Sequence, residues 1–537
     1  VILCKVVINP SSNKMDHSIL WPPESVRGMK LLDVAAFKKA ITVPIAEVKI
    51  SHISVVLKVL KRYYLKLRHF AAIEDGPEGT DYRVAFLHPL TFTESEEKVK
   101  SELKEVCQKV GNIESSSIVK FSNRSIELNY DNFDCNTTLR SILPLDEDAV
   151  AGYSRIGHII HLNLKEHLIS YKNIIGSVLL DKNKDVTMVV NKINTIDDSD
   201  NTFRSFSMEV LAGEGTTVTS VNQNGCTFTL DFAKVYWNPR LSTEHNIIVE
   251  MLNPQDILYD VMAGVGPFTV PAAKRRKCQV LANDLNPSSY HWLQHNCKKN
   301  MVLDRVQCHN MDGHEFIKTI VKVDLLKRWK DPDFSGTIHV TMNLPSIAIE
   351  FLPNFVGLMS DVNAQEQFNV IEPLVHVYMF SKDQKASSCV TRVAYYLGLV
   401  DTLPDFDGQI TDALKALHNP EEANGTQQAS GLTDADVRNL SGGKLLDKPI
   451  DIPGLVVEKV HLVRKVAPIK SMVRVSVRLT KELLMKNKTL VIGKGEAQEE
   501  SPVCMQEITN DVLADTEING STCKKRKLDL DSVKVKN

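Results

Sequence analysis

The stretch DILYDVMAGVGPF, residues 256–268, decides the fold. It has the pattern of a buried strand that ends at Asp260, followed by a turn containing Gly264 and Gly266 and then by an apolar helix. Glycine lets a ligand approach the backbone closely, and the first N–H groups of a helix are free to bind it. The stretch therefore predicts a nucleoside-binding turn at the carboxyl end of a strand.

Three further strands are expected after this turn, alternating with helices as in a parallel α/β sheet. The strand VLAND ends at Asp284, where a carboxylate can bind ribose hydroxyls. VQCHN leads to Asp312 and Gly313, which can accept a hydrogen bond from an adenine amino group and leave room for its ring. TIHVTM ends at Asn343 in an Asn-Leu-Pro run, which can aim an amide at a planar nitrogen. Taken singly, Asp284 can equally be a helix cap and Asn343 a turn residue.

The glycine turn differs from that of a dinucleotide-binding protein. A third small residue is expected at position 269, where this chain has Thr269, and Pro267 lies inside the loop. The four strand ends together favour a site for S-adenosylmethionine over one for NAD.

Composition narrows the class of protein. The 537 residues are 43% hydrophobic and 24% charged with a formal net charge of −2, as in ordinary globular proteins, so contacts with nucleic acid must be local. No stretch approaches the roughly 20 apolar residues of a membrane span. The ten cysteines form no CxxC pair, which predicts reduced thiols and no metal site.

Changes in composition along the chain predict seven regions. They are an N-terminal extension (1–19), an α+β domain (20–135), a β-rich intermediate domain (136–240), a catalytic domain (241–401), an inserted flexible loop (402–450), a closing hairpin (451–490) and a disordered tail (491–537). In the intermediate domain we expect strands at His158–Leu164, Ser177–Leu180 and Thr227–Phe232.

Two basic clusters have alternative interpretations. A helix from Val56 to Phe70 would gather Lys58, Lys61, Arg62, Lys66, Arg68 and His69, either as an RNA-facing patch or as a solvated helix face. KKRK at residues 524–527 is either a nuclear localisation signal or a chance cluster.

Several longer stretches carry a resemblance to one family. They are PPESVRGMKLLDVAAFKKAI (22–41), SRIGHIIHLNLKEH (154–167), VYWNPRLSTEH (235–245), NLPSIAIEFL (343–352) and VRKVAPIKSM (463–472). The sequence resembles the eukaryotic and archaeal tRNA (guanine-37-N1)-methyltransferases from about residue 22 to residue 479. The resemblance implies a class I (Rossmann-like) S-adenosylmethionine-dependent methyltransferase domain with a closing β-hairpin, preceded by smaller α+β tRNA-binding domains.

The resemblance also implies roles for individual residues. Methylation of guanine at N1 requires removal of the N1 proton, and Glu244 resembles the family's general base. Arg204 resembles the arginine that stabilises charge on O6, and Asn343 would position the guanine edge. The implied cofactor-binding residues are His245, Asp260, Gly264, Gly266, Asp284, Leu285, Asp312, Gly313 and Asn343.

Without the resemblance, several of these residues have plainer interpretations. Glu244 would be a first-turn glutamate of a helix, and Arg204 an exposed strand residue. Tyr236 and Trp237 could each stack on a base or belong to the core. Many relatives have arginine where this chain has His245.

We therefore expect transfer of a methyl group from S-adenosylmethionine to N1 of guanosine 37 in cytoplasmic and mitochondrial tRNAs. The family implies a role in reading-frame maintenance and in the first step of wybutosine synthesis, a monomer with tRNA as partner and no membrane, and location in cytoplasm, mitochondrial matrix and nucleus. The alternatives are a class I methyltransferase acting on another nitrogen, and a tRNA-binding protein without catalysis. The presence of Glu244, Asp284 and Asn343 speaks against the last.

Overall fold

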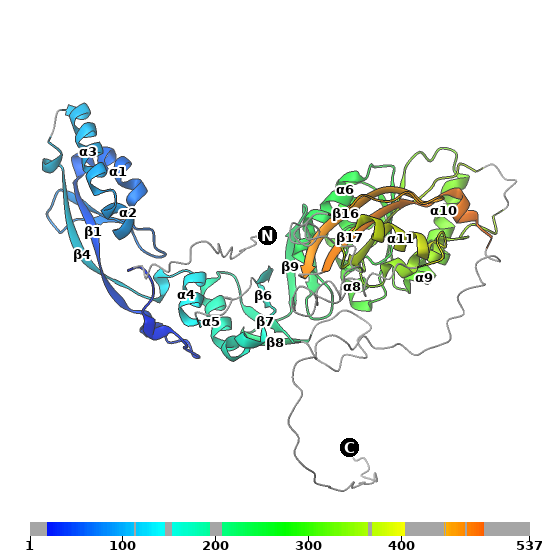
Figure 1. Cartoon of the computed structure of the whole chain (residues 1–537), viewed down its shortest axis with the longest axis horizontal. Coiled ribbons are helices and arrows are strands. Elements are labelled where there is room, and N and C mark those ends of the chain that lie inside the picture. Colours follow the sequence, from blue (N-terminus) through cyan, green and yellow to red (C-terminus); the bar gives the residue numbers. More distant parts are fainter. Residues whose placement is uncertain are drawn as a thin grey trace, which may run out of the picture. The chain divides into compact units, whose positions relative to one another are not determined.

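A computed structural model gives the fold of the chain (Figure 1). The residues that it describes are 19–111, 114–144, 153–193, 207–362, 368–402, 445, 447–467 and 470–487. Arg204, nearly all of the N-terminal extension, most of the expected 402–450 loop and the 491–537 tail lie outside the described residues.

A seven-stranded sheet forms the centre of the catalytic region (Figure 1). Its strands are β11 (Ile257–Asp260), β12 (Gln279–Asn283), β13 (Val306–His309), β14 (Ile338–Met342), β15 (Leu374–Ser381), β16 (Val456–Ala467) and β17 (Lys470–Arg478). Their order is β13-β12-β11-β14-β15-β17-β16. The first five are parallel, and the β16–β17 hairpin joins antiparallel to β15. The four predicted strands and the closing hairpin are confirmed.

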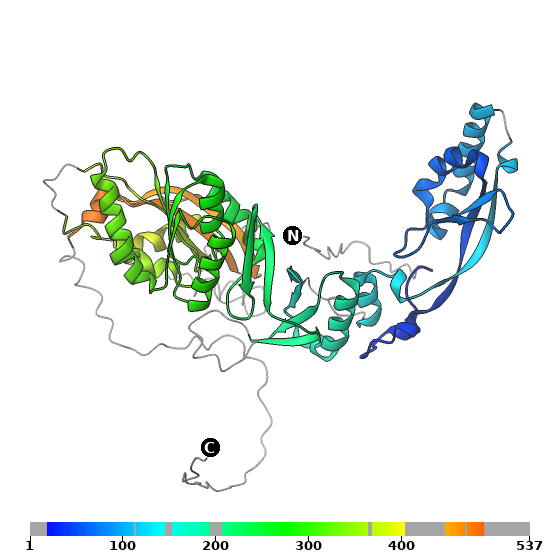
Figure 2. The ribbon, with the colours of Figure 1, turned by 180° about the vertical axis from the view of Figure 1, so that it is seen from behind.

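Helices cover both faces of this sheet, as the two opposite views show (Figure 1, Figure 2). They are α6 (Ser242–Met251), α7 (Thr269–Pro271), η10 (Ala272–Arg276), α8 (Pro287–Lys299), α9 (Gly313–Phe316), η11 (Ile317–Val321), α10 (Lys322–Lys330), η12 (Ala348–Phe355), α11 (Ala386–Tyr396) and α14 (Lys481–Met485). Side chains of β11 alternate between two hydrophobic cores, with Ile257 and Tyr259 in one and Leu258 in the other. Burial on both faces is typical of a parallel sheet flanked by helices.

The hairpin of β9 (Val218–Gln223) and β10 (Cys226–Asp231) packs on the catalytic region. The amide of Asn296 on α8 accepts the Thr229 N–H at 2.7 Å and donates to the Thr229 carbonyl at 3.0 Å and the Val265 carbonyl at 3.1 Å. Phe228 is fully buried in the same core as Leu258. The hairpin thus shares a core with the sheet, although the expected boundary at 240 placed it in the intermediate domain.

The intermediate region contains a second sheet of order β5-β6-β7-β8. Its elements are β5 (Ser154–Ile156), β6 (Ile159–Leu162), η7 (Glu166–Tyr171), α5 (Lys172–Lys182), β7 (Met188–Lys192) and β8 (Met208–Gly213), preceded by α4 (Cys135–Ile142). The strand expected at Ser177–Leu180 is wrong, because these residues lie in α5. β6 and β7 are parallel, and a parallel pair needs a crossover, which α5 supplies.

The first region is a four-stranded antiparallel sheet of order β2-β3-β1-β4 with helices packed on it. Its elements are β1 (Lys39–Lys49), α1 (Ile53–Leu60), η4 (Lys61–Tyr63), β2 (Ile73–Asp75), β3 (Tyr82–Phe86), α2 (Pro89–Thr93), α3 (Glu96–Gly111) and β4 (Val119–Leu128). Short 3-10 turns complete it at Glu24–Val26, Val34–Phe37, Ile50–His52, Ser115–Ser117 and Tyr130–Asn132.

The basic helix expected from Val56 to Phe70 is wrong in its second half. Helical structure ends at Tyr63, and Leu65 is fully buried with its N–H bonded to the Phe86 carbonyl at 2.9 Å. Burial of Leu65 against β3 takes the chain out of the helix, so Lys66, Arg68 and His69 do not continue a helical stripe. Among the described residues, no helix has the length and apolar character that crossing a membrane requires.

Candidate active site

A cavity of about 870 Å³ lies at the carboxyl ends of the parallel strands, a volume suited to a small-molecule cofactor. The predicted residues that line it are His245, Gly264, Asp284, Leu285, Asp312, Gly313 and Asn343. Glu244, Asp260 and Gly266 do not line it, and Arg204 lies outside the described residues.

The glycine turn and the second strand end are joined by one carboxylate. Oδ2 of Asp284 accepts the Gly264 N–H at 2.8 Å, and its Oδ1 accepts the Asn286 N–H at 3.0 Å. Gly264 has a φ of +55°, and a Cβ there would meet no atom within 4 Å, so this backbone borders open space. Gly266, with a φ of +95°, is packed instead against Leu293. Both positions require glycine for their conformation, but only Gly264 faces the cavity.

Asp260 lies beneath the turn, fully buried. Its two carboxylate oxygens accept hydrogen bonds from the hydroxyls of Thr269 at 2.7 Å and Thr341 at 2.8 Å. Burial raises the pKa of Asp260 to about 6. These two hydrogen bonds connect the end of β11 to α7, which follows the glycine turn, and to the neighbouring strand β14.

The third and fourth strand ends form the opposite wall. Asp312 caps α9 by accepting the backbone N–H of His314 at 2.8 Å. The His314 ring stacks on Phe351 with centroids 4.0 Å apart, and both line the cavity. Oδ1 of Asn343 is buried and has no hydrogen-bond partner among the described residues. A buried acceptor of this kind is suited to an N–H or NH₂ donor of a bound molecule.

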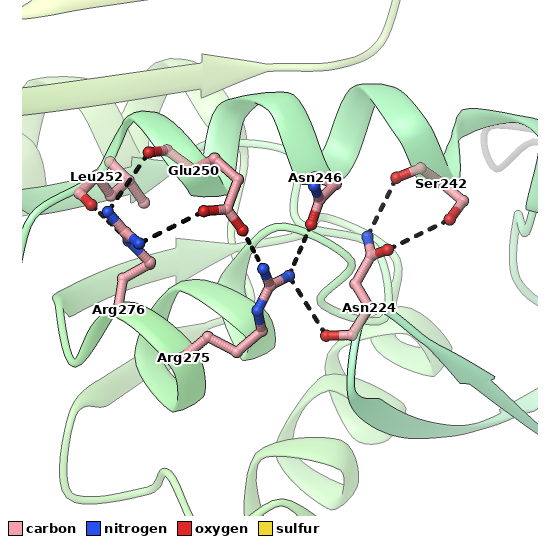
Figure 3. Close-up of polar contacts among 7 residues, drawn as sticks. All are labelled: Asn224, Ser242, Asn246, Glu250, Leu252, Arg275 and Arg276. Carbon is pink, nitrogen blue, oxygen red and sulfur yellow. Dashed lines mark hydrogen bonds and ion pairs between the residues drawn. The ribbon is translucent and has the colours of Figure 1, made fainter.

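Helix α6 carries Glu244 and His245, and polar contacts join it to η10, the helical segment that follows α7 (Figure 3). Arg275 donates to Asn246 Oδ1 at 2.7 Å and pairs with Glu250. Arg276 donates to the Leu252 carbonyl at 2.6 Å and also reaches Glu250. The helix that bears the predicted general base is therefore tied to the glycine-turn segment.

Glu244 is only 4% exposed and contacts three strands. Its Oε1 accepts hydrogen bonds from Nε of Arg474 at 2.7 Å and from the Tyr378 hydroxyl at 2.9 Å. Nε2 of His461 lies 3.3 Å from Oε2. Burial alone raises the pKa of Glu244, but His461, Arg474 and Tyr378 together lower it below its ordinary value. The carboxylate is thus ionised at neutral pH.

His245 is buried except where it borders the cavity, and it is uncharged at neutral pH. Burial lowers its pKa to about 4, with Glu244 acting in the opposite direction. Its Nδ1 lies 3.0 Å from Nε2 of Gln223, and its ring meets the Phe268 ring edge-on at 4.7 Å. A neutral imidazole here cannot offer the charge that an arginine would bring to this position.

The two aromatic candidates differ in exposure. Trp237 is 7% exposed and packs on Phe228 at 5.3 Å between ring centroids, so it belongs to the core. Both residues line the cavity, and Tyr236, at 42%, is the more exposed of the two. Arg240 and Arg464 line the cavity beside it, and burial together with the charge of Arg240 lowers the pKa of Arg464.

Sequence reasoning missed several residues of the site. These are His314, Phe351, Tyr378, Arg464 and Arg474. Phe351 and Arg464 lie in two of the stretches quoted for the resemblance, which was the only available signal for them. Among the described residues, no cluster of His, Cys, Asp or Glu could hold a metal ion.

The comparison with known proteins agrees with this geometry. Residues 219–385 match the TRM5/TYW2 methyltransferase domain, and residues 136–216 match the TYW2 N-terminal domain. A tRNA (guanine(37)-N(1))-methyltransferase of Drosophila pseudoobscura pseudoobscura is 40% identical over 88% of this chain and 93% of its own length. This chain belongs to the tRNA (guanine-37-N1)-methyltransferase family. The predicted family, enzyme class and class I methyltransferase fold are confirmed.

Other members of the family extend the likeness. The enzyme of that name from Homo sapiens is 37% identical over 94% of this chain and 86% of its own length. Among solved structures, the complex of aTrm5 and tRNALeu is 19% identical, covers 81% of this chain and 99% of that one, and has a TM-score of 0.48.

Proposed function

We propose that this methyltransferase transfers a methyl group from S-adenosylmethionine to N1 of guanosine 37 in tRNA. The observation that best supports this function is a single cavity lined by residues at the ends of four strands and by the exposed Tyr236. The Asn343 oxygen in this cavity has no hydrogen-bond partner among the described residues. Curated relatives that bear this activity in their names, at 37–45% identity, support the substrate.

The residues present fit S-adenosylmethionine. Asp284 offers a carboxylate beside the open backbone of Gly264, in the place where a ribose is bound in open α/β sheets. The Phe351 and His314 rings beside Asp312 provide an apolar face and a carboxylate for an adenine. When bound, S-adenosylmethionine supplies an electrophilic methyl group.

The chain's own residues handle the proton and the guanine. Glu244 would take the proton as the N1–H bond breaks, and the electron pair that stays on N1 would make this nitrogen a nucleophile. Asn343 holds the guanine edge, and Tyr236 offers a face on which the base stacks. We assign to Arg204 the stabilisation of negative charge on O6. Because Glu244 does not line the cavity, it acts through one intervening water.

The wider scope is part of the same proposal. We expect action on cytoplasmic and mitochondrial tRNAs, a first step of wybutosine synthesis where that pathway exists, a monomer, and location in cytoplasm, mitochondrial matrix and nucleus. Imaging of the tagged chain beside a variant with KKRK at 524–527 changed to alanines checks the nuclear part. Equal nuclear signal from both would contradict a role for that cluster.

The function is tested by transfer of labelled methyl to an unmodified tRNA. The substrates are a tRNA with guanosine 37 and its adenosine-37 variant, and the proteins are wild type, Glu244→Gln and the control Glu250→Gln. Both changes lie in α6 and remove one charge, but Glu250 faces the surface. We expect label on guanosine 37 alone, and loss by about 10²–10⁴-fold only in Glu244→Gln. Equal labelling of both tRNAs, or full activity of Glu244→Gln, would refute the site or the base.

A further inference from the structure

We propose that Arg474 and Tyr378 are positioning residues that hold one oxygen of Glu244, so that the other oxygen receives the guanine N1 proton. The proposal rests on the function proposed above. It adds two side chains from strands β15 and β17 to the machinery of methyl transfer.

The hydrogen bonds on Glu244 are unequally shared between its oxygens. Both strong donors, Nε of Arg474 and the Tyr378 hydroxyl, act on Oε1. Oε2 is buried and has no hydrogen-bond partner among the described residues, although His461 lies 3.3 Å away. Two donors on one oxygen fix the carboxylate plane and leave the lone pairs of the other oxygen for a proton.

The guanidinium of Arg474 is placed for this carboxylate. Its exposure is zero, and among the described residues its ion pair is with Glu244. Nη1 donates to Ser476 Oγ at 2.9 Å and lies 3.4 Å from Nδ1 of His376. His376 in turn lies 3.1 Å from His339. Because Ser476 and His376 are neutral, Glu244 is the charged group that the buried Arg474 contacts, and the two side chains form an ion pair.

Four titratable or charged groups face Glu244 from the elements packed around it. They are His245 on its own helix, Tyr378 on β15, His461 on β16 and Arg474 on β17. His245 is neutral, since its pKa is about 4. Burial raises the pKa of Glu244, and His461, Arg474 and Tyr378 each lower it. Loss of either donor therefore raises the pKa of Glu244, because the effect of burial is then less compensated. Glu244 becomes protonated at higher pH than in the wild type.

The test is the pH profile of single-turnover methyl transfer at saturating tRNA and S-adenosylmethionine. The variants are Arg474→Met, Arg474→Lys and Tyr378→Phe in the full chain. The matched control is Arg478→Met, on the same strand, where the arginine pairs with Glu458 at the surface. Binding of tRNA and of S-adenosylhomocysteine is measured for each variant.

We expect the acid limb of the profile to move to higher pH in Arg474→Met. In Arg474→Met the rate should fall about tenfold for each pH unit below the raised pKa, so the ratio of the variant rate to the wild-type rate should decrease as the pH is lowered from 9. Tyr378→Phe should move in the same direction by less, Arg474→Lys should restore part of the wild-type profile, and Arg478→Met should not move it.

The outcomes separate the two proposals. A uniform loss of rate at all pH values in Arg474→Met and Tyr378→Phe would overturn the positioning role and leave the function intact. If Arg474→Met does not fold, Tyr378→Phe decides alone, and an unmoved acid limb in that variant overturns the inference. Absence of transfer by the wild-type chain would instead refute the proposed function.

Discussion

Two buried carboxyl groups of the catalytic region, Asp260 and Glu244, show opposite electrostatic behaviour. Both are at most 4% exposed and both accept two hydrogen bonds. The partners of Asp260 are neutral hydroxyls, and burial raises its pKa to about 6. Glu244 faces Arg474 and His461, and its pKa is lowered despite burial. Two carboxyl groups of similar burial therefore have pKa values shifted in opposite directions. An adjacent cation keeps Glu244 ionised, and its absence lets Asp260 bind a proton more readily.

Arg474→Met should have the largest effect on stability. It leaves the Glu244 charge buried without a counter-ion, which costs about 3–5 kcal/mol. Urea unfolding at pH 7.5 followed by tryptophan fluorescence measures it, since Trp237, Trp292 and Trp329 lie in the catalytic region. The double variant with Glu244→Gln should recover most of the loss. An unrecovered loss would mean that packing of Arg474, and not its charge, is what matters.

Asp260→Asn should change how stability depends on pH. The pKa of Asp260 is raised in the folded state, so the wild type loses stability as pH rises from about 4 to about 6. The difference between variant and wild type should therefore shift in favour of the variant by on the order of 3 kcal/mol across this window. Unfolding at pH 4, 5, 6 and 8 checks it. A constant difference would show that folding does not raise the pKa of Asp260.

Tyr378→Phe should be next in size. It removes a hydrogen bond to an ionised carboxylate and keeps the ring in the core, so the cost is about 1.5–3 kcal/mol. The matched change is Tyr259→Phe, which removes a hydroxyl that donates to Asp324 at 2.8 Å. Similar unfolding free energies for both variants are expected. A negligible effect in Tyr378→Phe alone would mean that Arg474 by itself satisfies Glu244.

Glu250→Gln should have the smallest effect. It breaks Arg–Glu pairs of the same chemistry on the same helix, but the Glu250 side chain is 45% exposed. Water screens such pairs, and about 0–1 kcal/mol is expected. If Glu250→Gln lowers the free energy of unfolding as much as Arg474→Met does, burial is not the reason why the Arg474–Glu244 ion pair is strong.

The sequence predicted those site residues that lie just after the carboxyl ends of the parallel strands. Asp284 and Asn343 could be placed because each stands directly after a strand, Gly264 because it lies in the turn that follows β11, and the ends of parallel strands meet at one edge. Whether Asp260 points into the cavity or beneath the turn depends on two threonine hydroxyls, one of them on another strand. No local pattern could show that.

Other parts depend on contacts between distant segments. Arg474 is one of two arginines in β17, and nothing near it in the sequence marks its carboxylate partner. The apolar run Ser177–Leu180 is too short to show a helical period and so predicts a strand, whereas the parallel pairing of β6 and β7 requires a helix there. Leu65 ended the expected basic helix by pairing with β3, which is again a non-local contact.

The separation of Glu244 and Arg474 by 230 residues has a consequence for synthesis on the ribosome. At about 5–20 residues per second, the arginine is made about 10 to 50 s after the glutamate. During that interval the nascent chain has β15 without its antiparallel neighbour β17, and Glu244 without its counter-ion. The catalytic sheet therefore closes only after β17 has been synthesised, and until then the free edge of β15 is open to pairing with another chain.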